Sequence, residues 1–489
     1  MTQIKTQQLS STSVKTLADR PQIFTVWSNE IEGRIDPSFY RPEFKELEKV
    51  IIKGKYEVKT LNEIAEKISS GATPLSGGDA YTDKSEGIPF IRSGDIREDK
   101  SIDFDQLLYI KKEIHQKKLK SSQLKKGDVL VAIVGATIGQ VSLYDYDKEA
   151  NINQAIAMVR VSKDINPEYV KEYLLSIVGQ NQLNKIKRPV ARANINLEEV
   201  GSIKIPLPPL SIQNKIVDIM RKAYQEKKEK ETKANKLLES IDDYVLSELG
   251  IKMPEIKREM VFEVMSDEIR DRIDSEYYQE FYKDFIDEVK RCKFSKKKLE
   301  DITEFIMNGR TPAKDDYVEN EGIPLIKAGT ASGKLVDLEK LGYVKKDFKG
   351  KQTARKGDIF ILSAAHQAEY VGKNVSLLDK EPAQNTYFVG ELINVRANPE
   401  VCLSEYLFSF LASSFAFVLI NREKRGQTSH LYPDDLKNLI VPVPPLDVQK
   451  KIVDKLKFYR TQAQKLKDEA SNNLQKAKEQ VERIILRKA

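Results

Sequence analysis

The sequence repeats itself, and this repetition constrains the possible folds more than any other feature. The stretch IPLPPLSIQNKIV at 205–217 returns as VPVPPLDVQKKIV at 441–453, with eight of thirteen positions identical. FTVWSNEIEGRIDPSFY at 24–40 likewise returns as FEVMSDEIRDRIDSEYY at 262–278. Further matches, such as KGDVLV at 126–131 with its partner KGDIFI, lie between these ends in the same order. The matched segments keep one order, but their separation along the chain varies slightly. This pattern indicates two copies of one domain that differ in loop length.

The first part of each copy has the sequence pattern of a globular domain that contains both strands and helices. Short apolar runs such as VLVAIVG at 129–135 and DIFILSAA at 358–365 are separated by Gly, Pro, Asn and Asp. These β-type runs alternate with helical pieces such as LSEYLFSFLASSFAFVLI at 403–420, which together predict an α+β domain. We interpret the apolar residues of 403–420 as core rather than as a partner surface.

The second part of each copy begins at the Pro-rich stretch. Proline removes a backbone donor and fixes φ, so IPLPPL and VPVPPL predict an extended exit strand. Apolar residues three and four apart follow at once, which is typical of a coiled-coil helix. The predicted seams are Ile212, Ile216, Ile219, Ala223, Ala234, Leu237, Ile241, Val245 and Leu249 in copy one, and Val448, Ile452, Leu456, Tyr459, Ala463, Leu466, Ala470, Leu474, Ala477, Val481 and Ile484 in copy two.

Each predicted helix would extend about 55–60 Å at 1.5 Å per residue. A helix of this length needs a partner that buries its apolar stripe, and the two helices are natural partners for each other. The predicted fold class is therefore α+β, with two tandem domains, each followed by a long helix. We expect the two helices to pack as an antiparallel coiled coil with pseudo-twofold symmetry and one globular domain near each end.

These patterns divide the chain into six predicted parts. They are an N-terminal tail (1–23), a first globular domain (24–210), a first spacer helix (211–250), a linker (251–261), a second globular domain (262–446) and a second spacer helix (447–488).

Composition excludes several classes of protein. The net charge of +7 permits nucleic-acid binding through local basic patches without requiring it. Two cysteines and three histidines leave no basis for a disulfide framework or a metal centre, and a reduced, cytoplasmic protein is expected. The chain has no signal-like apolar start and no run of about 18 apolar residues, so no membrane span is expected.

Several segments together resemble a known family. They are the two Pro-rich stretches at 205–216 and 441–452, GIPFIRSGDI at 87–96, GATIGQVSLYD at 135–145 and NINQAIAMV at 151–159. In combination these segments resemble the specificity (S) subunit of type I restriction-modification systems over nearly the whole chain. Copy two departs from the pattern, with AAHQAEYVG at 364–372 in place of GATIG, and Gln384–Asn385 as a loose counterpart of Asn153–Gln154.

The resemblance implies a function without catalysis. Members of the family carry two target-recognition domains, each of which reads one half of a bipartite DNA target. Their long helices separate the domains and dock methyltransferase subunits, two per chain, while motor-nuclease restriction subunits complete the assembly. The implied partners are thus double-stranded DNA and these subunits, with no membrane. No cofactor is expected on this chain; S-adenosylmethionine, ATP and Mg are expected on the partner subunits.

Candidate DNA-reading residues lie in four loops, at 91–99, 185–196, 326–334 and 421–430. Each loop mixes basic residues with amide or small residues, and Arg and Lys suit guanine while Asn and Gln suit adenine. The loops at 185–196 and 421–430 occupy matching places before the Pro-rich stretch. For each single residue, an ordinary solvated loop is the alternative. The predicted DNA-binding residues are Arg92, Arg188, Arg192, Asn194, Lys327, Arg422, Lys424, Arg425 and Gln427.

The Pro-rich stretches supply a second set of candidates, which we interpret as a structural seam. A Gln in the first turn of a helix can bond free backbone groups, and this favours a structural role over an exposed side chain or a methyltransferase contact. The seam residues are Pro208, Pro209, Gln213, Pro444, Pro445 and Gln449.

A search for catalytic patterns yields no candidate catalytic or metal-binding residue. GTASGKL at 329–335 resembles a phosphate loop but is one residue short and lacks the Ser or Thr after Lys334. Three hypotheses remain: a DNA-reading specificity module, a self-contained nuclease or methyltransferase, and a scaffold whose domains bind protein. The two copies take up the chain and leave no third domain for catalysis, which favours the first hypothesis. The recognised bases depend on loop geometry and are not predicted.

Overall fold

A computed structural model of the chain provides the fold. It describes residues 24–31, 33–74, 79–97, 101–104, 106–188, 193–269, 272–319, 321–365, 367–426 and 430–486. The chain divides into two compact units, unit 1 (Met1–Glu229 with Glu469–Ala489) and unit 2 (Lys230–Asp468). Each unit therefore combines one globular domain with segments of both long helices.

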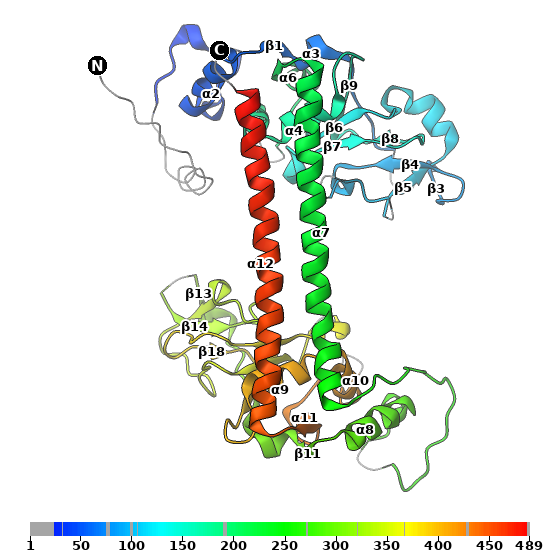
Figure 1. The fold of residues 1–489 in the computed structure, drawn as a ribbon, viewed down its shortest axis with the longest axis vertical. Coiled ribbons are helices and arrows are strands. Elements are labelled where there is room, and N and C mark those ends of the chain that lie inside the picture. The colour runs from blue at the N-terminus through cyan, green and yellow to red at the C-terminus, as the bar shows by residue number, and fades with distance from the viewer. Residues whose placement is uncertain are drawn as a thin grey trace. The chain divides into compact units, whose positions relative to one another are not determined.

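Unit 1 contains two four-stranded sheets and one two-stranded pair (Figure 1). Their orders are β2-β9-β6-β7, β3-β5-β4-β8 and β1-β10, and only the β4–β8 pairing is parallel. The strands are β1 (Glu57–Thr60), β2 (Ala65–Ser70), β3 (Tyr81–Thr82), β4 (Ile88–Ile91), β5 (Leu108–Ile110), β6 (Asp128–Ala132), β7 (Val141–Tyr144), β8 (Asn151–Ile152), β9 (Ile156–Val161) and β10 (Lys204–Leu207). The helices are α2 (Pro42–Ile52), α3 (Leu61–Ile64), α4 (Pro167–Leu175), α5 (Ile177–Ile186), α6 (Leu197–Gly201) and the first half of α7 (Leu210–Leu249).

Unit 2 repeats this topology strand for strand. Its sheets have the orders β12-β19-β16-β17, β13-β15-β14-β18 and β11-β20, with a parallel β14–β18 pairing. The strands are β11 (Ser295–Lys298), β12 (Thr303–Asn308), β13 (Tyr317–Val318), β14 (Ile323–Ile326), β15 (Gly342–Val344), β16 (Ile359–Leu362), β17 (Val375–Leu377), β18 (Tyr387–Phe388), β19 (Leu392–Ala397) and β20 (Ile440–Val443). The helices are α8 (Phe281–Arg291), α9 (Ser404–Leu411), α10 (Ser414–Arg422), α11 (Pro433–Lys437) and most of α12 (Leu446–Ile485). Two tandem α+β domains, each followed by a long helix, confirm the predicted fold class.

The duplication extends to buried polar contacts. Asp128 is fully buried at the start of β6 and forms two 2.7 Å bonds with Arg160 of β9. Asp358 and Arg396 repeat this ion pair in unit 2, at 2.7 and 2.8 Å. Each aspartate follows a glycine with φ +93°, a value that side chains rarely tolerate, which explains the repeated Lys-Gly-Asp sequence.

The Pro-rich stretches form exit strands, as predicted. β10 pairs with β1 and β20 pairs with β11, both antiparallel. The long helices begin one residue earlier than expected, at Leu210 and Leu446, because the carbonyls of Pro209 and Pro445 already accept first-turn bonds. α7 ends at Leu249, before Gly250 with φ +72°, which suits a helix stop.

The predicted apolar seams are buried or half-buried along both helices. In unit 1, Ile216 and Met220 of α7 share one core with Val481 and Ile485 of α12. In unit 2, Val245 and Leu249 of α7 share the core with Ile452 and Leu456 of α12, and the rings of Tyr244 and Tyr459 lie 5.8 Å apart. Each unit thus contains the N-terminal part of one long helix and the C-terminal part of the other. This is the arrangement that antiparallel pairing predicts within a unit.

The apolar piece at 403–420 forms α9 and α10, which lie in the core of unit 2. Tyr406, Phe408, Phe410 and Phe415 are fully buried there, in agreement with the predicted core role. Within the described ranges, no single helix is long and apolar enough to span a membrane. The bent α9–α10 pair passes a test of length and composition alone.

Candidate nucleic-acid interface

The two strongest candidate loops occupy equivalent places in the two units. Loop 1 (residues 187–196) joins α5 to α6, and loop 2 (residues 423–432) joins α10 to α11. Backbone bonds close the base of each loop: Arg188 N donates to Asn194 O at 3.0 Å, and Arg425 and His430 exchange two bonds of 2.8 Å. The candidates Arg192 and Gln427 lie outside the described residues.

Arg188 and Arg425 stand at the two loop bases and are tied to carboxylates. Arg188 is 3.0 Å from Glu199, the third residue of α6, and Arg425 is paired with Asp435, the third residue of α11. Their side chains nevertheless remain 47% and 51% exposed. Asn194 is exposed as well. These three side chains can therefore meet a ligand at the surface.

Arg422 and Lys424 are less free than their sequence context suggests. Arg422 lies 3.8 Å from the centre of the Tyr277 ring and donates to the Tyr277 carbonyl at 3.2 Å, with 22% of its side chain exposed. The Nζ atom of Lys424 lies 5.1 Å from the Phe417 ring centre and 3.5 Å from the Ala368 carbonyl. Burial lowers the pKa of Lys424 to about 8.

Arg92 and Lys327 occupy matching positions directly after β4 and β14. Arg92 donates from its backbone and its guanidinium to Asp95, and these bonds raise the Arg92 pKa. Lys327 is exposed, and its aliphatic stem lies over Gly342. Among the described residues, no hydrogen bond or ion pair joins either side chain to loop 1 or loop 2.

The structure adds two segments that sequence reasoning did not select as binding candidates. Residues 133–139 run beside loop 1, where Ile195 N donates to Ile133 O and Gly135 N donates to Ala193 O, both at 2.9 Å. In unit 2, Leu431 N donates to Ser363 O at 3.0 Å and Lys424 Nζ lies 3.5 Å from Ala368 O, so the described residues after β16 lie beside loop 2. The sequence did contain one indication of these two segments: AAHQAEYVG diverges from GATIG next to a strand that is otherwise repeated.

One sequence-based correspondence is wrong. Phe90 of β4 lies opposite Asn151, whereas its counterpart Leu325 of β14 lies opposite Tyr387. This register matches Asn153 to Val389, rather than to the Gln384–Asn385 pair, because an insertion shifts the second copy. The side-chain contacts agree: Thr73 bonds Gln154 in unit 1, and Thr311 bonds Glu391 in unit 2.

The seam glutamines form buried joints between helix and domain. Gln213 is 3% exposed; its Oε1 accepts from Asn166 N and its Nε2 donates to Pro208 O, both at 2.9 Å. Gln449 is fully buried, accepts from Leu403 N at 2.8 Å and donates to Pro444 O at 2.8 Å. Pro208 and Pro444 are buried, whereas Pro209 and Pro445 are exposed and accept first-turn bonds.

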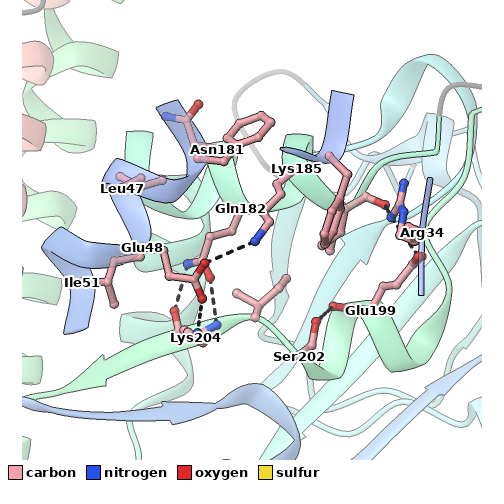
Figure 2. Close-up of a pocket in the computed structure, with 14 residues that line it drawn as sticks. Arg34, Leu47, Glu48, Ile51, Asn181, Gln182, Lys185, Glu199, Ser202 and Lys204 are labelled. Carbon is pink, nitrogen blue, oxygen red and sulfur yellow. Dashed lines mark hydrogen bonds and ion pairs between the residues drawn. The ribbon is translucent and has the colours of Figure 1, made fainter. Parts of the chain in front are cut away.

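A pocket of about 320 Å³ lies in unit 1 between α2, α5 and β10 (Figure 2). Figure 2 shows Glu48 bonded to both Lys185 and Lys204, and Arg34 beside Glu199. The acidic and basic groups thus pair with each other. Within the described part of the chain, no three His, Cys, Asp or Glu residues are grouped so that they could hold a metal ion.

The structure thus shows two copies of one domain, each with a surface loop that carries basic residues at its described ends. The model of the type I restriction modification DNA specificity domain matches the chain twice, over residues 53–240 and 292–476. The chain therefore belongs to the family of type I restriction-modification DNA specificity subunits.

Curated relatives agree with this assignment. The chain is 25% identical over 459 residues to a putative type I restriction enzyme MjaX specificity subunit of Methanocaldococcus jannaschii, covering 92% of this chain and 97% of that protein. It is 37% identical over 136 residues to the EcoBI specificity subunit of Escherichia coli, a match that covers 28% of each protein. A solved structure from a study of complex assembly and conformational transition of the type I R-M system shares the fold. Its TM-score is 0.50 at 17% identity, and the match covers 88% of this chain and 96% of that one.

Proposed function

We propose that this chain is a non-catalytic specificity subunit that recognises a bipartite DNA target. Each domain reads one half of the target, and the chain directs partner adenine methyltransferase and restriction subunits to it. On this proposal the chain holds no cofactor, while S-adenosylmethionine serves the methyltransferase and ATP with Mg serves the motor-nuclease. The 40-residue helices α7 and α12 serve as the spacer and as the docking elements for two methyltransferase subunits.

One observation carries the proposal: a loop in the equivalent place, closed at its base by an antiparallel backbone bridge, occurs once in each copy of the domain. Loop 1 and loop 2 each present a half-exposed arginine at the base. Arginine is the side chain best suited to bidentate contact with guanine, and it also binds phosphate. Two equivalent reading surfaces on one chain suit a target in two parts, and linked weak sites gain affinity through effective concentration.

The first prediction concerns the sequence that the complex methylates. When the chain is co-expressed with its methyltransferase, mapping of methylated adenines across the host genome should return a split motif with an unread spacer of fixed length. Replacing residues 24–210 with the matching domain of a family member of different specificity should change only one half of that motif. Retention of the other half is the internal control.

Other outcomes favour the other hypotheses. A continuous motif, or methylation by this chain without a partner, would identify an enzyme with its own active site. A purely protein-binding scaffold would support no methylation and would show no salt-dependent DNA affinity. A DNA reader should lose affinity steeply as salt rises, because phosphate contacts release counterions.

A second prediction follows from the lowered pKa of Lys424, which lies at about 8. Above this pH the side chain becomes neutral, so its attraction to phosphate is lost and DNA affinity should fall between pH 7 and 9. The stability effect has the opposite sign, since the unfolded state binds more protons in the window between the folded pKa and the ordinary lysine value. Fluorescence anisotropy of labelled target DNA at pH 7, 8 and 9 measures the affinity.

Lys424→Arg is the matched variant for this measurement. Arginine stays charged over this range, so the pH profile of the variant should be flatter than that of the wild type. Lys457→Arg, at an exposed lysine of α12, should leave the profile unchanged. Equal slopes for the wild type and Lys424→Arg would remove Lys424 from the DNA interface.

A further inference from the structure

A segment near the start of each domain folds into the same small motif in both copies. We name these motifs latch 1 (residues 33–40) and latch 2 (residues 272–278). In latch 1, Arg34 Nε donates to Asp36 at 2.9 Å and Tyr40 Oη donates to the Arg34 carbonyl at 2.5 Å. Latch 2 repeats both bonds, from Arg272 to Asp274 at 2.8 Å and from Tyr278 to the Arg272 carbonyl at 2.6 Å. The repeated Arg-Ile-Asp sequence therefore has a repeated geometry.

Each latch arginine binds the point where the candidate loop begins. Arg34 Nη1 donates to the carbonyl of Ile186, the last residue of α5, at 2.8 Å. Arg272 Nη2 donates to the carbonyl of Lys424, just after α10, at 2.6 Å. Both bonds join residues that are 152 positions apart in the sequence, so each latch ties a distant segment to the loop entrance.

An aromatic residue of each latch reinforces this anchor. The Phe39 ring centre lies 4.7 Å from both Arg34 and Lys185. In latch 2 the Tyr277 ring lies 4.3 Å from Arg272 and 3.8 Å from Arg422. Two cations beside one ring hold the last turn of α5 or α10 against the latch, and such contacts gain strength when water is excluded.

Latch 1 also reaches the far end of its loop. Glu199 Oε1 accepts from Arg34 Nη1 at 3.1 Å (Figure 2). It also accepts from Arg188 Nε at 3.0 Å, so one carboxylate joins the latch to the loop base. In latch 2, Arg272 Nη1 lies 3.8 Å from Glu423, while Arg425 at the loop base is paired with Asp435. In unit 1 the entrance and the base of the loop are therefore linked through one carboxylate, whereas in unit 2 two separate ion pairs hold them.

Within the described part of the chain, each latch arginine leaves one buried donor unpaired, which fold stability alone does not explain. Arg34 Nη2 and Arg272 Nη1 are buried and have no hydrogen-bond partner among the residues that the structure describes. A buried donor without a partner destabilises the folded state. Both copies nevertheless have arginine here, and a residue that sets the geometry of a reading surface would account for this.

We propose that Arg34 and Arg272 are positioning residues for DNA recognition, each holding one loop in the geometry that reads one half of the target. The inference rests on the proposed function, since it requires that the loops contact DNA. Neither arginine contacts the bases itself on this proposal. Bidentate base contacts discriminate between bases only when the side chains are closely placed, so a loosened loop loses selectivity first.

The test compares methylation motifs of complexes that carry single substitutions. Arg34→Ala should make bases in one half of the motif degenerate, and Arg272→Ala should do so in the other half only. In each case the preference for the correct base should fall by roughly tenfold, as the loss of one base contact implies. The matched controls are Arg41→Ala and Arg258→Ala, whose exposed side chains make only surface ion pairs, and they should leave the motif unchanged.

A purely structural role gives a different result. Destabilisation lowers the yield of methylation at every site and leaves the base preferences intact, so an unchanged motif in Arg34→Ala or Arg272→Ala overturns the inference. If Arg34→Ala does not fold, Tyr40→Phe removes the hydroxyl bond to the Arg34 carbonyl, and an unchanged half-motif there is equally decisive. Degeneracy in both halves from one substitution also rejects the proposal. A wild-type complex without a two-part motif would instead reject the proposed function.

Discussion

Replacing Asp358 with Ala is expected to destabilise unit 2 by about 3–5 kcal/mol, the usual cost of removing one partner from a buried ion pair. Asp358 is fully buried and holds Arg396 through two bonds of 2.7 and 2.8 Å. It also accepts from Asn394 Nδ2 at 2.9 Å and from Arg355 N at 3.0 Å. The substitution therefore leaves a guanidinium, an amide and a backbone N–H group without their acceptor. Urea unfolding of the full chain measures the loss.

Two further variants separate this effect from a general loss of charge. Asp287→Ala removes a surface partner of Lys290 on α8, and surface pairs of this kind contribute little to stability. Asp358→Ala combined with Arg396→Met should recover part of the lost stability, because no unpaired buried charge remains. A single Asp358→Ala variant as stable as the wild type would show that the ion pair is not a structural anchor.

Gln449→Leu is expected to destabilise unit 2 by about 2–4 kcal/mol, because buried unsatisfied groups cost about 1–3 kcal/mol each. The side chain is fully buried and bonds Leu403 N at 2.8 Å, Pro444 O at 2.8 Å and Val401 O at 3.1 Å. Leucine fills a similar volume but leaves these backbone groups unpaired. Thermal unfolding gives the stability, and hydrogen exchange at the Leu403 amide reports the loss of the joint directly.

The matched control for this joint lies on the same helix. Gln464 is exposed and bonds only Asp468, one turn further along α12, at 2.8 Å. Gln464→Leu should therefore change the stability by less than about 0.5 kcal/mol, as surface substitutions usually do. Faster exchange at Leu403 in Gln449→Leu alone would locate the effect in the joint. Slow exchange in both variants would mean that other contacts hold α9 to the helix.

Much of the fold follows from local sequence signals. Repeated segments in one order predict two domains, prolines predict the exit strands, and apolar residues three and four apart predict the long helices. The register of β8 and β18 did not follow, because an insertion moved the counterpart of Asn153 away from Gln384–Asn385. Strand register depends on which residues pair across the sheet, and this information is not local.

The candidate site was less predictable than the fold. The basic loops were identified from composition and from their matching places in the two copies. Arg422 was expected at a DNA surface, yet it packs on Tyr277, a residue 145 positions earlier. The latch residues Arg34 and Arg272 are visible as a repeat, but their partners at the loop entrances are 152 positions away. Composition alone does not separate a free arginine from a bonded one.

Local sequence patterns were sufficient to predict a tandem repeat of one α+β domain with a long helix after each copy. This was possible because turn residues, helix periodicity and duplication can be recognised from residues that are adjacent or equally spaced in the sequence. The packing of the chain, by contrast, sets which charged side chains are bonded and which can meet a ligand. That outcome depends on carboxylates, carbonyls and rings that come together only when distant parts of the chain pack, since an ion pair or hydrogen bond forms over a few ångströms.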